Sequence, residues 1–248
     1  EAKSKTKEKT RRRVKGGEGM KPTAFGSSVV VLALAVLAGP RAEAQDLQQK
    51  VAAAKQAAAQ NQQSLRTYSW LETTEIVVKG EVKNTKLESC RYGPDGTVQK
   101  TVVQKSPPPD KKPGLRGRVV EKKTGEMQAE MQAAGALVHQ YLPPSPDKIQ
   151  AAMAAGKVTV TPGAATALRI ADYLKAGDAL TLTLAQGKGI QQVAVNSYLD
   201  TPDKAVTLNV QMQALPDGTG YPGSIVLAVP SDNIEVRISN SNYQKVAP

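Results

Sequence analysis

The sequence contains very few of the side chains that catalyse reactions or bind metals. Its 248 residues include one His, one Cys, one Trp and one Phe. Cys90 cannot form a disulfide within the chain, because an internal bridge needs two cysteines. A zinc site with Cys and His ligands is excluded for the same reason, and a Ser-His or Cys-His enzyme would have to use His139. No acidic or thiol side chain lies one helical turn from His139, so we expect a structural or surface histidine.

These scarcities argue against an enzyme, and we expect no metal and no cofactor. The Asp residues of the second half of the chain fall at predicted strand ends and turns, where solvated carboxylates are common. Cys90 lies in a predicted strand. It is either a buried small apolar residue, which we favour, or a free thiol that pairs between molecules.

The net charge of +11 suggests a nucleic-acid partner, but the distribution of the charge does not. Ten Lys and Arg against four Glu precede Gln45, so six of these charges lie in residues 1–44. The other five match the excess within residues 105–123, where seven Lys and Arg accompany two acids. A nucleic-acid binder needs a wider basic face, and single-strand binding needs aromatic side chains that this stretch lacks. We therefore expect no nucleic-acid partner.

Residues 20–44 have the three parts of a secretory signal peptide. A short basic start is followed by apolar residues 29–38 and by an A-x-A site that ends at Ala44. The apolar run is shorter than the roughly twenty residues of a membrane span. We expect cleavage between Ala44 and Gln45, which predicts a periplasmic or extracellular protein that does not span the membrane afterwards.

Residues 1–19 stand before the methionine of that signal. Residues 15–19 can be encoded by a purine-rich, ribosome-binding stretch of bacterial DNA, so we expect translation to begin at Met20. The alternative is a disordered basic extension that is translated and then removed with the leader.

Residues 45–248 are predicted to form a single α+β domain. Apolar positions spaced by four, three, four and seven residues predict a helix over 46–66. The β-rich segments 67–78, 82–92 and 97–104 are separated by turn residues and predict three antiparallel strands.

The proline-flanked basic stretch 105–123 predicts an exposed loop, since prolines remove strand hydrogen-bond donors. Helices are predicted over 126–142 and 146–156, the second capped by Ser145. Alternating apolar and polar residues then predict five to seven further strands. One curved antiparallel sheet, an incomplete barrel with helices packed on its concave face, would bury every apolar stripe.

Two groups of side chains are candidates for contacts with other molecules. The first comprises large apolar side chains that line either the core, the commoner role, or an adaptable ligand pocket: Tyr68, Trp70, Met127 and Met131. The second is the basic stretch, which is either solvated or contacts anionic lipid or an acidic partner; its candidates are Lys111, Lys112, Arg116 and Arg118.

The order of these elements is similar to that of the lipoprotein-localisation-factor superfamily, the outer-membrane lipoprotein carriers. An exported chain begins with a Gln-rich helix ending in Leu65-Arg66-Thr67-Tyr68-Ser69-Trp70, followed by a meander, a helical insertion and a second meander. The resemblance covers residues 46–246. It implies an incomplete barrel closed by helices around an apolar cavity that shelters lipid acyl chains in the periplasm. One departure concerns aromatic content. Carrier cavities are rich in bulky apolar and aromatic side chains, whereas this chain loses its single Phe, Phe25, when the signal is removed.

The sequence thus predicts an exported, non-enzymatic protein that binds an apolar ligand, a lipid or a lipidated polypeptide, between sheet and helices. The alternative is a cell-envelope structural or adaptor protein that binds other proteins through sheet edges and helices. The two functions differ in whether the space between sheet and helices is hollow.

Overall fold

The computed structural model describes residues 56–107, 115–185 and 189–246, without the side chains of 115–121. The predicted extension, signal peptide and cleavage site at Ala44 and Gln45 lie outside these residues. Within the described part, no helix is long and apolar enough to cross a membrane.

The described chain consists of a helix at residues 56–65, three strands, two further helices and seven further strands. This order confirms the sequence prediction. The elements are β1 (Tyr68–Val78), β2 (Glu81–Tyr92), β3 (Val98–Lys105), α2 (Leu115–Val138), α3 (Pro146–Ala154), β4 (Val158–Thr161), β5 (Ala165–Ala171), β6 (Ala179–Ala185), β7 (Gly189–Tyr198), β8 (Ala205–Ala214), β9 (Gly220–Val229), the 3-10 turn η1 (Pro230–Asp232) and β10 (Ile234–Lys245).

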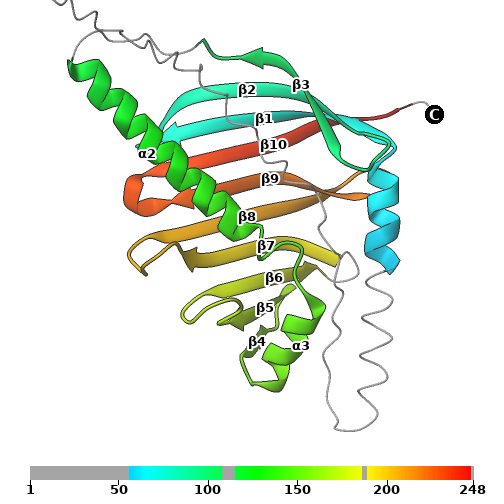
Figure 1. Cartoon of the computed structure of the whole chain (residues 1–248). Helices are drawn as coiled ribbons and strands as arrows, with labels where there is room; N and C mark the ends of the chain where they lie inside the picture. The colour runs from blue at the N-terminus through cyan, green and yellow to red at the C-terminus, as the bar shows by residue number, and fades with distance from the viewer. Residues whose placement is uncertain (1–55, 108–114, 186–188, 247–248) are drawn as a thin grey trace, which may run out of the picture.

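All ten strands belong to one antiparallel sheet, in the order β3-β2-β1-β10-β9-β8-β7-β6-β5-β4 (Figure 1). Nearly every pair of neighbours is consecutive in sequence, as in a meander. The exception is the pairing of β1 with β10, which joins the two meanders. The sheet does not close, because β3 and β4 form its two edges. The α+β class and the antiparallel sheet are therefore confirmed.

The apolar side chains of the second meander line up across the strands on one face of the sheet. One row runs through Ile170, Leu180, Val195, Leu208 and Leu227, each directly opposite the next. All five are buried. Because side chains alternate between faces along a strand, this register places the apolar set of every strand on the same side. We call this side the inner face.

Helices α2 and α3 cover part of the inner face. Helix α2 crosses the sheet diagonally and contacts β9, whereas α3 lies against β5 (Figure 1). Ala134 and Val138 of α2 and Ile149 of α3 belong to the same buried cluster as the strand rows. Ser145 caps α3 as predicted, since its side-chain oxygen accepts a hydrogen bond from the Lys148 backbone N–H at 3.4 Å.

The predicted loop over residues 105–123 is wrong in its second half. Strand β3 extends to Lys105, and α2 begins at Leu115, about ten residues earlier than the sequence suggested. Lys, Arg and Glu favour helix almost as strongly as Ala does, and Lys122 forms an i,i+4 ion pair with Glu126 at 3.7 Å. The prediction gave the prolines and the charge too much weight against these propensities.

A buried hydrogen-bond network ties the end of α2 to the second meander. The Asp178 carboxylate accepts hydrogen bonds from the Tyr141 hydroxyl and from the backbone N–H groups of Leu174 and Lys175. The Ser197 hydroxyl lies 2.8 Å from the same phenol oxygen. Asp178 is 1% exposed, so bulk water does not reach the carboxylate in the folded protein.

We predict that Asp178→Ala lowers the free energy of unfolding by about 3 kcal/mol, because the buried Tyr141 hydroxyl and two half-buried backbone N–H groups lose their charged acceptor. Urea denaturation followed by circular dichroism measures the change. Asp200→Ala, at an exposed turn position, is the matched control and should leave the midpoint unchanged. Equal midpoints for the two variants would contradict the structural role of Asp178.

Candidate functional site

The inner face changes character at β1, β2 and β10. The alternate residues at the start of β1 that point to this face, Tyr68, Trp70 and Glu72, are aromatic or acidic and buried. Trp70 lies opposite Cys90 of β2, and Glu72 lies between Glu88 of β2 and Asn240 of β10. One position further along, Thr74 of β1 pairs with Ile238 of β10, which belongs to the apolar core. The polar region is thus continuous with the core on the same face.

Five aromatic residues gather in this region, and we call them the aromatic cluster: Tyr68, Trp70, Tyr92, Tyr221 and Tyr243. The Trp70 ring stacks on Tyr243 with centroids 5.5 Å apart and planes at 10°, and Tyr92 lies 5.5 Å from Trp70. Tyr221 and Tyr68 approach Tyr243 to 4.3 and 6.3 Å. The cluster takes the single tryptophan and four of the seven tyrosines, so it holds most of the aromatic surface of the described chain.

Two ion pairs lie beside the aromatic cluster, and we call them the charged pairs. Lys100 of β3 contacts Glu72 at 2.5 Å, and Lys86 contacts Glu88 at 2.8 Å. The two glutamates face each other across β1 and β2 and are 7% and 3% exposed. Like charges in that position destabilise a sheet, and a buried carboxylate without a partner costs several kcal/mol. The lysines offset both costs.

Burial and charge together leave Cys90 unreactive. The thiol is fully buried, which confirms the favoured prediction for this residue. Desolvation raises the pKa of Cys90 to about 12, and the neighbouring Glu72 carboxylate adds to the increase. Since the thiolate is the nucleophile, a thiol held protonated to that pH takes no part in covalent chemistry near neutrality.

Three buried side-chain atoms within this region form no hydrogen bond within the described chain, and one of them, Oε2 of Glu88, is held by its ion pair with Lys86. The other two are the indole nitrogen of Trp70, a donor, and the side-chain oxygen of Asn240, an acceptor. The side-chain nitrogen of Asn240 donates to the Pro222 carbonyl at 2.9 Å, so only the side-chain oxygen of this amide forms no hydrogen bond within the described chain. Buried polar groups are nearly always paired. These atoms are therefore unusual in the described chain.

The helix at residues 56–65 anchors the start of β1. Asn61 exchanges two hydrogen bonds with the backbone of Gly220, at 2.6 and 2.8 Å. The Tyr68 hydroxyl donates to Asp217 at 2.5 Å, and this bond, with those from Thr219, lowers the pKa of Asp217 to about 2. These contacts hold the first strand against the β8–β9 turn and fix the position of the aromatic cluster.

The apolar candidate residues of the sequence analysis lie in two different parts of the structure. Tyr68 and Trp70 belong to the aromatic cluster, whereas Met131 packs against the apolar core under α2. Met127 is half-buried, one helical turn before it. Of the basic candidates, Lys111 and Lys112 lie outside the described residues, and Arg116 and Arg118 lie in the first turns of α2, with side chains that are not described.

Sequence reasoning missed the charged pairs, Asn240 and Tyr243. A partial indication was present, because Glu72 follows Trp70 by two residues and Glu88 precedes Cys90 by two. A period of two puts each such pair on one face. Which strand lies beside which was not readable, so the pairing of Glu72 with Lys100, 28 residues away, could not be inferred.

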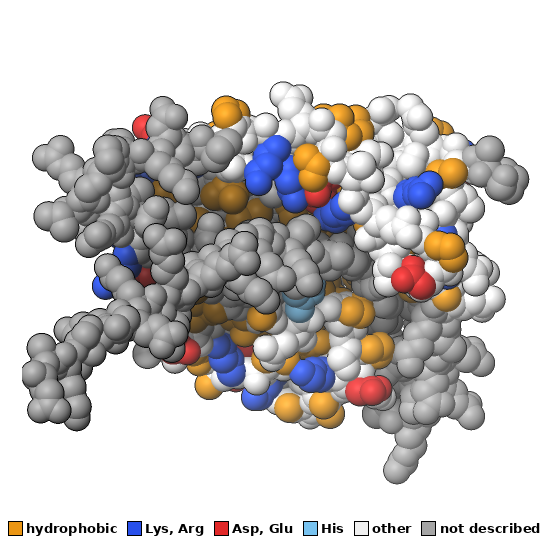
Figure 2. Space-filling view, turned by 45° about the horizontal axis from the view of Figure 1, so that its top comes forward, with side chains coloured by type: hydrophobic (Ala, Val, Ile, Leu, Met, Phe, Trp, Pro, Cys, Tyr) orange, Lys and Arg blue, Asp and Glu red, His pale blue; other side chains and the backbone are white. Residues whose placement is uncertain are grey.

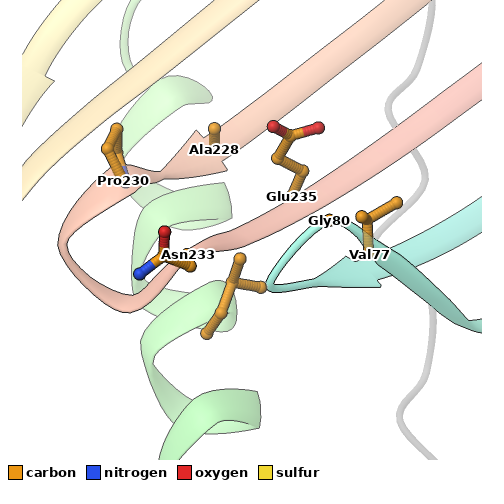
Figure 3. Close-up of a pocket in the computed structure, with 7 residues that line it drawn as sticks. Val77, Gly80, Ala228, Pro230, Asn233 and Glu235 are labelled. Carbon is orange, nitrogen blue, oxygen red and sulfur yellow. The ribbon is translucent and has the colours of Figure 1, made fainter.

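A separate small pocket opens where the β1–β2 and β9–β10 hairpins meet (Figure 3). Its volume is about 190 Å³, below the roughly 300 Å³ at which pockets for drug-sized ligands begin. Its one ionisable lining residue, Glu235, is paired with Arg237 at 2.7 Å. Its lining residues are Val77, Gly80, Ala228, Pro230, Asn233, Ile234 and Glu235.

No family model and no curated protein matches the sequence. A solved structure, that of a DUF1329 family protein from Desulfovibrio piger ATCC 29098, is similar to this chain with a TM-score of 0.35 and 10% identity. The match covers 75% of this chain and 90% of that one.

The charged pairs give a test of the site's construction. We predict that Glu72→Ala lowers the free energy of unfolding by about 3 kcal/mol, because it leaves a poorly exposed Lys100 without its counter-ion. The double variant Glu72→Met with Lys100→Met should recover most of that loss, since both charges leave together. Glu81→Ala, which breaks the exposed pair with Lys83, should change nothing measurable. A double variant less stable than Glu72→Ala contradicts this interpretation.

Cys90 gives a second test. We predict that iodoacetamide alkylates Cys90 at pH 8 roughly a thousandfold more slowly in the native protein than in urea, because the raised pKa leaves almost no thiolate. The control is Ser89→Cys in a Cys90→Ala background, which moves the thiol to the adjacent exposed position. Mass spectrometry follows both rates, and equal rates in the native state would contradict the burial.

Proposed function

We propose that this chain is a non-enzymatic binding protein, which holds an amphiphilic ligand, a lipid or a lipidated polypeptide, against the aromatic cluster. In this proposal the helices cover the concave side of the sheet, and the ligand lies on the part of the inner face that carries the cluster. The observation that supports it most is the buried indole nitrogen of Trp70, which has no partner among the described residues, within a group of aromatic rings.

The chemistry of the region suits a ligand with an apolar chain and a polar group. Tyr and Trp offer large apolar surfaces with a polar edge. Burying an acyl chain against such rings contributes about 25 cal/mol per Å², before the cost of ordering the ligand. The unpaired donor of Trp70 and acceptor of Asn240 would bind the polar group. Figure 2 shows one face of the molecule, on which lysine and arginine side chains lie among hydrophobic and acidic ones.

We place the proposed ligand outside the space beneath α2. The described part of that space is filled by the protein's own side chains, including Ala134, Val138 and Tyr141, which are buried in the apolar core. The proposed ligand therefore lies closer to β1 and β10 than the methionines of α2 suggested.

We propose no enzymatic activity because the ionisable side chains beside the aromatic cluster are either uncharged or ion-paired. Cys90 is held as a thiol, and each buried glutamate of the charged pairs is matched by a lysine. The periplasmic location is part of the same proposal and rests on the sequence of residues 20–44 alone.

The single tryptophan makes the proposal directly testable. We predict that a phospholipid with brominated acyl chains quenches Trp70 fluorescence, whereas the same lipid without bromine does not, because the heavy atoms would come into contact with the indole. Tyr243→Ala should weaken binding by about tenfold, since it removes the ring stacked on Trp70.

The matched control is Tyr198→Ala, which removes a tyrosine that contacts Lys175 instead of the aromatic cluster. It should bind the brominated lipid like the native protein. Absence of quenching at saturating lipid, in a protein whose circular dichroism is native, would contradict the proposal.

A further inference from the structure

The two edges of the sheet are protected very differently. Strand β4 has four residues and is followed at once by Pro162. Short strands and proline are common means of blocking further pairing at a sheet edge. Strand β3 has eight residues and no proline within it, although its pairing with β2 shifts register at Val103, so it offers a longer row of backbone groups on the side away from β2.

Strand β3 also exposes two neighbouring apolar side chains. Val102 and Val103 are 54% and 58% exposed, among the most exposed large hydrophobic residues of the described chain. Val102 lies opposite Glu88 and so belongs to the inner face, whereas Val103 falls at a register shift of β3 against β2 and has no partner residue in β2. A strand added beside β3 would pair with its free edge and cover part of the surface of these valines.

The charge of β3 selects the partner. Its only ionisable residues are Lys100 and Lys105. Lys100 is matched by Glu72, but Lys105 lies directly opposite Lys86 of β2 and forms no ion pair within the described chain. Two like charges in that position are unfavourable, so the end of this edge carries an uncompensated positive charge.

From these observations we infer that β3 is a docking edge for an extended acidic segment of another protein, which adds to the sheet as an eleventh strand. Backbone pairing supplies the affinity in this mode of recognition, and alternate side chains supply the specificity. A second copy of this chain is a poor occupant, because pairing two β3 strands brings lysines together without any acid. This inference is independent of the ligand proposed for the aromatic cluster.

The probe is an eight-residue peptide that alternates glutamate with valine and is blocked at both ends. We expect it to protect the backbone amides of β3 from hydrogen exchange, and the amides of β4 to exchange as before. Two matched peptides carry N-methyl groups on the odd or on the even residues, which removes the donors of one edge or the other. One of them should lose binding and the other should keep it, because a strand pairs through a single edge.

Charge reversal tests the specificity. A peptide with lysine in place of glutamate should bind at least about fivefold more weakly, and Lys105→Glu should reverse that preference. Lys148→Glu, an exposed position on α3, is the control and should preserve it.

Several outcomes would overturn the inference. If both N-methylated peptides bind like the parent, the contact is not strand pairing. If the lysine peptide binds equally well, the partner is not selected by acidity. Absence of protection in β3 at millimolar acidic peptide removes the docking edge altogether, and concentration-dependent dimers that protect β3 would assign it to a second copy.

Discussion

The pairing of β1 with β10 is the interaction on which the rest of this molecule depends. The two strands lie near opposite ends of the described chain, and their ladder runs from Tyr68 with Lys245 to Val78 with Ile234. It joins a three-stranded meander to a seven-stranded one and makes a single sheet from both. Neither meander could build the candidate site alone, because Trp70 comes from the first and Tyr243 from the second.

The sheet that results must bury one face without closing into a barrel. Along β4 to β9, helices α2 and α3 complete an apolar core in the ordinary way. Near β1 and β2 the same face carries ion pairs and aromatic rings. Buried ion pairs are weak sources of stability, since desolvation offsets most of the attraction. An apolar surface would pack more simply than these ion pairs do. In the proposed function, the ion pairs and the unpaired atoms of Trp70 and Asn240 serve binding instead.

An open sheet also has two edges, and here they differ in a way that packing does not require. Strand β4 is short and followed by proline, whereas β3 is longer, positively charged and carries two exposed valines. Lysine on an edge discourages association with identical chains. The same charge favours an acidic partner, so protection against aggregation and selection of a partner have one physical cause.

The sequence by itself determined the elements, because periodicity and turn chemistry are local. Period-two alternation located the later strands, and Ser145 marked the start of α3. Local propensity was misjudged over residues 115–123, where helix-forming charged residues outweighed the nearby prolines. Tyr68 and Trp70 were recognised because aromatic residues stand out in a chain that has so few. Only the tertiary structure decided that Glu72 meets Lys100, that Trp70 stacks on Tyr243, and that Met131 belongs to the core. Those contacts depend on which strands become neighbours, and strand order is set by the burial of the whole inner face, which no short stretch of sequence encodes.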